Sequence, residues 1–202
     1  MIFRKRKVKV GIAFGGGGAR GFAHLGALKA FEQFGVKFDF VAGTSAGSLV
    51  GAFYANGYNF KELYEIAKNV RVKDIRKNVI PFTASKLDSL AEIVRKNLGD
   101  KNIEDSLIPF AAVAVDLKSA KEVCFRKGNL ASAVCGSCAV PGVFQPVEYN
   151  DMILADGGLQ NTIPADIPKY FGCDYVVAID VNKSRLYGTN STKFLDVLSC
   201  SI

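Results

Sequence analysis

A serine between two glycines is the first residue pattern that could carry chemistry. Residues 43–47 read Gly-Thr-Ser-Ala-Gly, which places Ser45 at the centre of a GxSxG motif. An apolar segment precedes the motif and a helix-like segment follows it. In that context the serine stands at a sharp strand-to-helix turn with its hydroxyl exposed. Gly43 and Gly47 suit the turn because a Cβ there would clash. The pattern favours a nucleophile over a serine that only caps a helix.

A run of glycines upstream offers main-chain hydrogen-bond donors. Residues 16–21 read Gly-Gly-Gly-Ala-Arg-Gly and match GxGxxG between an expected strand and an expected helix. Such a loop can hold the phosphates of a dinucleotide, or its N–H groups can form an oxyanion hole. A dinucleotide site needs an acidic residue near the end of the second strand, whereas Asp39 stands at its beginning. An oxyanion hole beside the nucleophile is therefore the favoured interpretation.

A serine nucleophile needs a base, and the usual base is histidine. His24 is the one histidine, and it precedes Ser45, whereas the histidine of an ordinary α/β-hydrolase follows both the serine and the acid. We expect His24 to be a structural residue of the first helix. Asp156 is the candidate base instead, because it follows a short apolar strand. Gly157 and Gly158 would then let the backbone turn sharply after it.

Alternating strands and helices must position these residues. Strands are expected at residues 8–14, 38–42, 110–116, 121–126, 146–149, 152–155 and 175–181. Helices are expected at residues 19–34, 45–56, 60–69, 87–98 and 130–138, and from residue 192. This order predicts an α/β fold with three layers, α/β/α, and a mainly parallel central sheet. The apolar strand at 175–181 is expected in the middle of the sheet, and the segment around Pro81 could form a lid or side wall.

Composition narrows the class of protein. The 202 residues are 49% hydrophobic and 22% charged, as in a soluble globular domain, and contain no apolar run long enough to span a bilayer. Without an export signal at the N-terminus, we expect a cytoplasmic protein. An odd number of cysteines then indicates free thiols, and we expect Cys135 and Cys138 to be buried thiols rather than metal ligands or a redox pair. The cysteines are Cys124, Cys135, Cys138, Cys173 and Cys200.

The net charge of +7 is concentrated near the N-terminus, where residues 1–7 form an expected basic tail before a single domain at 8–202. Basic charge favours anionic partners. The sequence has no zinc finger, RNP motif or alternation of basic and aromatic residues, so nucleic acid is not expected. Peripheral contact with an anionic membrane surface, on the inner side of the membrane, is the favoured partner.

Together these residues resemble the patatin-like phospholipase family in its compact bacterial form. The resemblance runs from about Val8 to Val181. It rests on residues 16–21, 43–47, 141–144 and 156–158, with Asn161 and Pro164. It implies Ser45 as nucleophile, Asp156 as base, and no metal or cofactor. The resemblance also implies an oxyanion hole at Gly16, Gly17 and Gly18, with Arg20, Gly21, Gly43, Gly47, Gly157 and Gly158 supporting the motifs.

The implied activity is the hydrolysis of fatty acyl esters, such as phospholipids or lysophospholipids, through an acyl-enzyme. Three alternatives stay open: an idle lipid-binding or regulatory protein, a dinucleotide-binding module, and an enzyme that acts on thioesters or acylated proteins. Many relatives have arginine where Cys135 stands and proline where Gln145 stands. Relatives also continue past the last strand, so a truncation at the C-terminus is expected.

Overall fold

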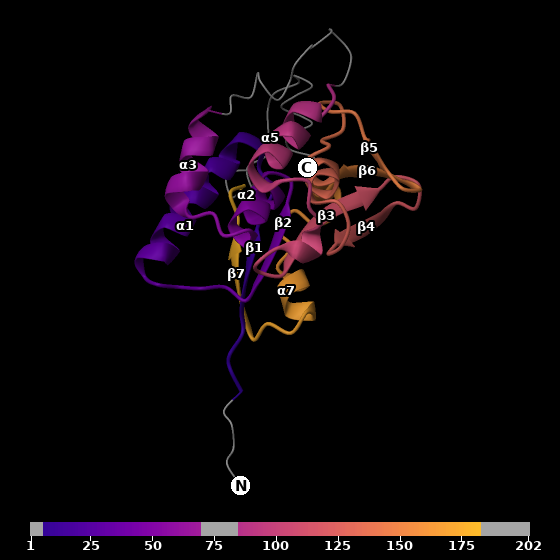
Figure 1. The fold of residues 1–202 in the computed structure, drawn as a ribbon. Coiled ribbons are helices and arrows are strands. Elements are labelled where there is room, and N and C mark those ends of the chain that lie inside the picture. Colours follow the sequence, from indigo (N-terminus) through magenta and orange to yellow (C-terminus); the bar gives the residue numbers. More distant parts are fainter. Residues whose placement is uncertain (1–5, 70–84, 183–202) are drawn as a thin grey trace, which may run out of the picture.

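The computed structural model describes residues 6–69 and 85–182 of the chain. A seven-stranded sheet forms its centre, in the order β5-β6-β3-β2-β1-β7, with β4 paired to β3 (Figure 1). The strands are β1 (Val10–Phe14), β2 (Phe40–Thr44), β3 (Phe110–Asp116), β4 (Lys121–Phe125), β5 (Val147–Tyr149), β6 (Met152–Asp156) and β7 (Tyr175–Ile179). Strands β7, β1, β2 and β3 run parallel, whereas β4 and β6 pair antiparallel with β3, and β5 pairs antiparallel with β6. The predicted α/β class and mainly parallel central sheet are confirmed.

Helices cover the sheet on two sides. They are α1 (Phe22–Gln33), α2 (Ala46–Ala55), α3 (Phe60–Asn69), α5 (Asp88–Leu98), α6 (Leu130–Ser137) and α7 (Asp166–Tyr170). The larger core lies under α1, α2, α3, α5 and α6, where Val41 points from β2. Its strand neighbours Phe40 and Ala42 point to the opposite face and pack near Ile167 of α7. Strands β2 and β3 are buried throughout because both of their faces are covered.

Strand β7 differs from the prediction. The sequence placed it in the middle of the sheet, but in the described part of the chain β7 pairs with β1 alone and ends the strand order. Tyr175 is 67% exposed, and no residue of β7 is fully buried. The prediction was wrong because an apolar edge strand, packed on one side, has the same composition as a central one.

Most other element boundaries agree within a few residues. The helix expected from residue 19 begins as a short 3-10 turn, η1 (Gly18–Gly21), before α1. Between the expected strands at 146–149 and 152–155 the chain turns at Asn150, which has a left-handed conformation with a φ of 52°. The segment around Pro81 and the helix expected from residue 192 lie outside the described residues. Among the helices that are described, none is both long and apolar enough to cross a membrane.

Candidate active site

Ser45 lies at the turn between β2 and α2 in a strained backbone conformation. Its φ of 53° and ψ of −125° are unusual for any residue other than glycine. A Cβ on Gly43 would approach the Gly47 carbonyl oxygen to 2.4 Å, and a Cβ on Gly47 would approach the Phe14 carbonyl oxygen to 2.1 Å. Both positions therefore require glycine. The strand-turn-helix context that the motif needs is present.

Ser137 holds this turn in place from the last residue of α6. The backbone N–H of Ser45 donates to Ser137 Oγ at 2.8 Å, and Ser137 Oγ donates to the Val113 carbonyl at 2.5 Å. All three residues are buried. The strained turn is thus tied to β3 through one side chain. Sequence reasoning did not single out Ser137, because nothing local connects it with a residue so far away in the chain.

Strands β2 and β6 both pair with the same edge of β3, and this pairing brings the base candidate Asp156 close to Ser45. Thr44, the last residue of β2, is in register with Val113, and Asp156, the last residue of β6, is in register with Ala114. Strand β4 occupies the other edge of β3 over these positions. The ends of β2 and β6 therefore meet at consecutive residues of β3. This pairing brings together two residues that lie far apart in the sequence.

Burial determines the protonation chemistry of Asp156. The residue is 1% exposed, and burial raises its pKa to about 6, while the Ser45 side chain and the Gly158 N–H lower it. Oδ1 accepts a hydrogen bond from the Gly158 N–H at 2.8 Å. Oδ2 is buried and has no hydrogen-bond partner in the described part of the chain. The Ser45 hydroxyl is thus near enough to influence Asp156, but it makes no hydrogen bond of ordinary length and angle to it.

The two glycines after Asp156 have distinct roles. A Cβ on Gly157 would lie 2.3 Å from the Val113 carbonyl oxygen, so this position requires glycine where β6 ends against β3. Gly158 supplies the N–H that binds Asp156 Oδ1. Together they fix the carboxylate at the strand end, as the Asp-Gly-Gly pattern indicates.

The glycine-rich loop lies beside Ser45, but only part of it offers free donors. A Cβ on Gly16 would be 3.4 Å from the Ser45 Cβ. The Gly16 N–H already donates to the Thr162 carbonyl at 2.8 Å. The N–H groups of Gly17 and Gly18 donate to no acceptor among the described residues. Of the three glycines predicted to form an oxyanion hole, Gly16 uses its N–H to anchor the loop, whereas the N–H groups of Gly17 and Gly18 remain available as donors.

Close packing fixes the position of this loop. A Cβ on Gly21 would approach Ala46 Cβ to 2.7 Å, so η1 lies directly against the first turn of α2. Gly18 has a φ of 54°, in the region that favours glycine. The side chain of Arg20 is exposed and makes no hydrogen bond or ion pair within residues 6–69 and 85–182.

His24 supports the glycine-rich loop through its buried ring. Its ring is fully buried, and Nε2 lies 2.7 Å from the Gly15 carbonyl oxygen, so this nitrogen carries the proton and donates. The ring also packs edge-on against Phe14, with the ring centroids 5.2 Å apart. Burial lowers the pKa of His24, opposed by the hydrogen bond to Gly15, so the imidazole is neutral. His24 therefore contacts the backbone of the loop rather than Ser45.

The cysteines do not form a disulfide in the described residues, which exclude Cys200. Cys135 and Cys138 are buried on α6 and at its end, and burial raises the pKa of both thiols. Cys138 also lies near Asp156, whose charge raises the thiol pKa further. No cluster of three or more metal-ligating side chains occurs in the part of the chain that is described.

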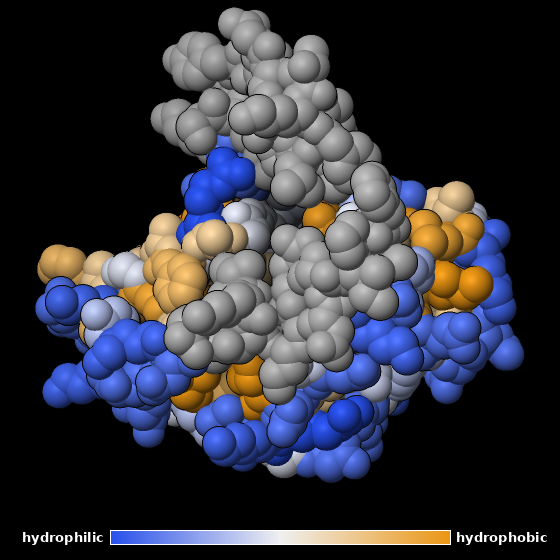
Figure 2. Space-filling model, turned by 90° about the horizontal axis from the view of Figure 1, so that it is seen from above, coloured by the Kyte–Doolittle hydropathy of each residue, from blue (hydrophilic) through white to orange (hydrophobic). Residues whose placement is uncertain are grey.

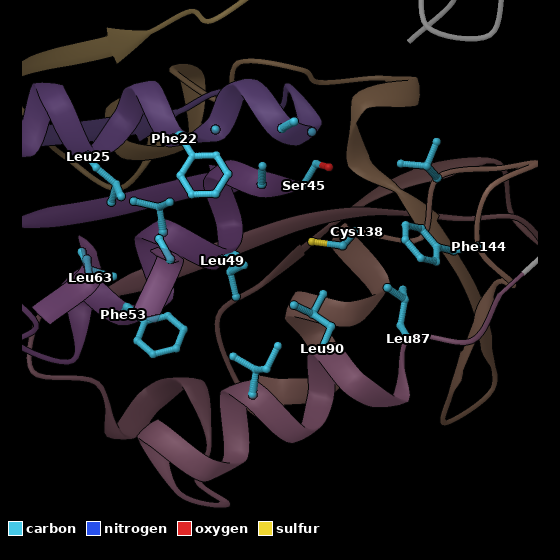
Figure 3. Close-up of a pocket in the computed structure, with 18 residues that line it drawn as sticks. Phe22, Leu25, Ser45, Leu49, Phe53, Leu63, Leu87, Leu90, Cys138 and Phe144 are labelled. Carbon is cyan, nitrogen blue, oxygen red and sulfur yellow. The ribbon is translucent and has the colours of Figure 1, made fainter. Parts of the chain in front are cut away.

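An apolar cavity of about 250 Å³ opens beside Ser45. Apart from Ser45 and Cys138, its lining consists of glycines and apolar side chains. The lining residues are Gly18, Ala19, Gly21, Phe22, Leu25, Ser45, Ala46, Leu49, Val50, Phe53, Leu63, Ala67, Leu87, Leu90, Ile93, Cys138, Val140 and Phe144. The Ser45 hydroxyl faces this space in Figure 3. The Ser45 hydroxyl and Gly18 thus border an apolar pocket, and the buried Asp156 lies behind Ser45 rather than in the pocket lining.

The fold and this site define a patatin-type α/β protein, and comparisons with known proteins give the same result. The family model for patatin-like phospholipase matches residues 12–169. The chain therefore belongs to the patatin-like phospholipase family, as the motifs predicted.

Individual relatives are consistent with this assignment. The chain is 34% identical over 181 residues to an uncharacterized NTE family protein of Mycobacterium tuberculosis, covering 88% of this chain and 50% of that protein. It is 32% identical over 179 residues to lysophospholipase NTE1 of Candida glabrata, covering 85% of this chain and 10% of that protein. The crystal structure of VipD from Legionella pneumophila has the same fold, with a TM-score of 0.60 and 14% identity over 75% of this chain and 46% of VipD. The chain thus spans half, or a much smaller part, of these relatives.

Proposed function

We propose that this protein is a serine acyl hydrolase that cleaves fatty acyl esters of lipids, with phospholipids or lysophospholipids as the substrate class. Ser45 is the nucleophile and Asp156 is the base. The observation that carries the proposal is the pairing of β2 and β6 at Val113 and Ala114, which brings the end of β6 with Asp156 next to the turn with Ser45. The apolar pocket beside Ser45 supports it further. The name of the Candida relative, a lysophospholipase, agrees with this substrate class.

The first half of the reaction forms an acyl-enzyme. Asp156 takes the proton of the Ser45 hydroxyl as Oγ bonds to the ester carbonyl carbon. The N–H groups of Gly17 and Gly18 bind the resulting oxyanion, and loss of one such donor costs about 3–4 kcal/mol in other serine hydrolases. The bond from carbon to the alcohol oxygen then breaks. Asp156 returns its proton to that oxygen, and the alcohol leaves.

The second half regenerates the enzyme. Asp156 takes a proton from water as the water oxygen bonds to the acyl carbonyl carbon. The bond to Ser45 Oγ breaks, the proton returns to Oγ, and a fatty acid is released. A base is most effective when its pKa lies near the working pH. The pKa of about 6 therefore suits Asp156 better than the 3.8 of an unperturbed aspartate.

The lining of the pocket supports lipid substrates. Burial of each methylene group of a substrate chain contributes about 0.8 kcal/mol. Because the lining contains no charged side chain, an acyl chain could be buried without desolvating an ion. Phe22 is 54% exposed at the edge of the cavity and extends the apolar surface outward.

Arg6 and Lys7, the two described residues of the basic tail, are poorly placed to bring this pocket to a membrane. Arg6 forms an ion pair with Asp174, and Lys7 forms one with Asp39 at 2.7 Å. These residues precede β1, whereas Ser45 follows β2, and β1 and β2 are parallel. Arg6 and Lys7 therefore lie at the end of the sheet opposite the Ser45 turn. Contact of Arg6 and Lys7 with an anionic membrane would leave the Ser45 turn at the far end of the sheet.

The proposal is tested with Ser45→Ala and Asp156→Asn, assayed on a lysophospholipid and on a short-chain nitrophenyl ester. Each variant should lose activity at least a hundredfold, because the members of a catalytic pair act as a unit. Ser106→Ala and Asp151→Asn, both outside the pocket, are the matched controls and should retain parent activity. A fluorophosphonate should label the parent protein but not Ser45→Ala.

Three results would oppose the proposal. Parent-like activity in Ser45→Ala would show that Ser45 is not the nucleophile. Lipid binding without turnover, although Ser45 is intact, would favour an idle lipid-binding protein. Faster turnover of acyl thioesters or acylated peptides than of any lipid ester would move the enzyme to a different substrate class.

A further inference from the structure

The apolar cavity extends to both sides of Ser45. Figure 3 shows Phe22, Leu25, Phe53 and Leu63 on one side of it, and Cys138, Leu87 and Phe144 on the other. The first group comes from α1, α2 and α3, and we call this part of the cavity the α2 arm. The second group comes from the residue before α5 and from the segment that follows α6, and we call it the α6 arm. An ester bound at Ser45 has two ends, so each arm can take one of them.

The position of the base decides which end enters which arm. Asp156 must return its proton to the oxygen of the departing alcohol, so that oxygen has to leave on the Asp156 side. Asp156 lies on the α6 side, since its N–H donates to the Ala139 carbonyl at 2.9 Å and its charge acts on Cys138. The alcohol therefore points toward the α6 arm. The acyl chain is left with the α2 arm.

We propose that the acyl chain of the substrate runs from Ser45 along α2 and that Phe53 closes the far end of its binding site, while the alcohol occupies the α6 arm. This assignment rests on the proposed acyl hydrolase activity. Phe53 is 2% exposed and packs edge-on against Tyr58, with the ring centroids 5.2 Å apart. It therefore forms a fixed end wall rather than a movable one.

The spacing along α2 sets the chain length that fits. Ser45 and Phe53 are separated by eight helical steps, or about 12 Å at about 1.5 Å per residue. An extended hydrocarbon chain advances about 1.25 Å per carbon for bonds of about 1.5 Å at tetrahedral-like angles. The arm thus holds an acyl group of roughly eight to ten carbons in full, and longer chains must extend out of it.

The test is a series of nitrophenyl esters from C4 to C16, measured as kcat/KM for the parent and three variants. For the parent, kcat/KM should rise by up to about fourfold per carbon, the effect of one buried methylene, and stop rising near C8 to C10. Phe53→Ala should move this limit two or three carbons longer. Ala67→Phe, which fills the α2 arm from a half-buried position on α3, should move it shorter. Phe144→Ala, in the α6 arm, should leave the limit unchanged and alter the preference among alcohols.

The chain-length limit is expected to move in opposite directions in Phe53→Ala and Ala67→Phe. If thermal melting shows that one of them is unfolded, the other still tests the inference. A limit that moves in Phe144→Ala instead would place the acyl chain in the α6 arm and overturn the inference. A flat chain-length profile in an active parent would also overturn it while leaving the proposed function intact. Absence of ester cleavage, together with absence of labelling by alkyl fluorophosphonates, would reject the proposed function itself.

Discussion

The backbone N–H of Ser45 donates to the hydroxyl of Ser137, 2.8 Å away and ninety-two residues further along the chain. This bond uses the main-chain donor of the proposed nucleophile for structure rather than for binding the oxyanion. It also connects the strained turn to β3, because the same hydroxyl donates to Val113.

Ser137→Ala should lower kcat about tenfold or more with little change in KM. The variant leaves the Ser45 N–H and the Val113 carbonyl buried without a partner, which should cost about 1–3 kcal/mol of stability. Loss of geometry at Ser45 would appear as slower labelling by a fluorophosphonate, and loss of stability as a lower melting temperature. Ser132→Ala, which removes a hydrogen bond to Asn129 in the first turn of α6 and none to Ser45, serves as a control for loss of helix stability. An unchanged labelling rate in a destabilised Ser137→Ala protein would show that Ser137 does not position Ser45.

The activity should depend on pH through Asp156. Only the ionised carboxylate can accept a proton, and its pKa is raised to about 6. We expect kcat/KM to be constant above pH 7 and to fall tenfold per unit below about pH 6. An aspartate with the ordinary pKa of 3.8 would keep full activity down to pH 5. Measuring kcat/KM between pH 4 and pH 8 on an uncharged ester separates these cases.

Asp156→Asn should be inactive but more stable than the parent at neutral pH. The pKa of Asp156 is about 6 in the folded protein and near 3.8 in the unfolded chain. The folded protein therefore holds the proton more tightly, and stability falls as the pH rises from about 4 to about 6. The neutral amide of Asp156→Asn avoids burying that charge, so its free energy of unfolding at neutral pH should exceed that of the parent by about 2–3 kcal/mol. Denaturant unfolding at pH 5 and pH 8 measures it, and equal stability of parent and variant at pH 8 would contradict the raised pKa.

His24→Phe should weaken the oxyanion loop without removing a proposed catalytic group. The new ring can keep the packing on Phe14, but the hydrogen bond to the Gly15 carbonyl is lost. We expect a severalfold lower kcat and a loss of about 1–2 kcal/mol of stability.

The same variant should change the response to acid. The pKa of His24 is lowered in the folded protein. Its contribution to stability is therefore complete above about pH 6.5 and is lost as the pH falls further. His24→Phe should lack this part of the acid sensitivity, which melting temperatures between pH 5 and pH 8 would show. A variant with parent-like acid sensitivity would indicate that another group is responsible.

The sequence predicted what depends on local pattern. The turn at Ser45 and the glycines at 43 and 47 follow from one short motif between a strand and a helix, and Asp156 follows from the need for a base when His24 is excluded. The bond from Ser137 and the use of the Gly16 N–H by Thr162 could not be predicted in this way. Both arise between segments that are distant in sequence. Strand β7 was misplaced because composition does not distinguish an edge strand from a central one.

Strands β2 and β6 end at neighbouring residues of β3. Strand β3 therefore sets the distance between Ser45 and Asp156, although it contains neither of them. Val113 and Ala114 point to opposite faces of the sheet, so one residue inserted between them would move the carboxylate away by about 3.3 Å and bring the two paired positions to the same face. Loops elsewhere in the molecule can change length without touching this separation. Insertions and deletions in β3 are therefore expected to abolish turnover even where the rest of the fold survives them.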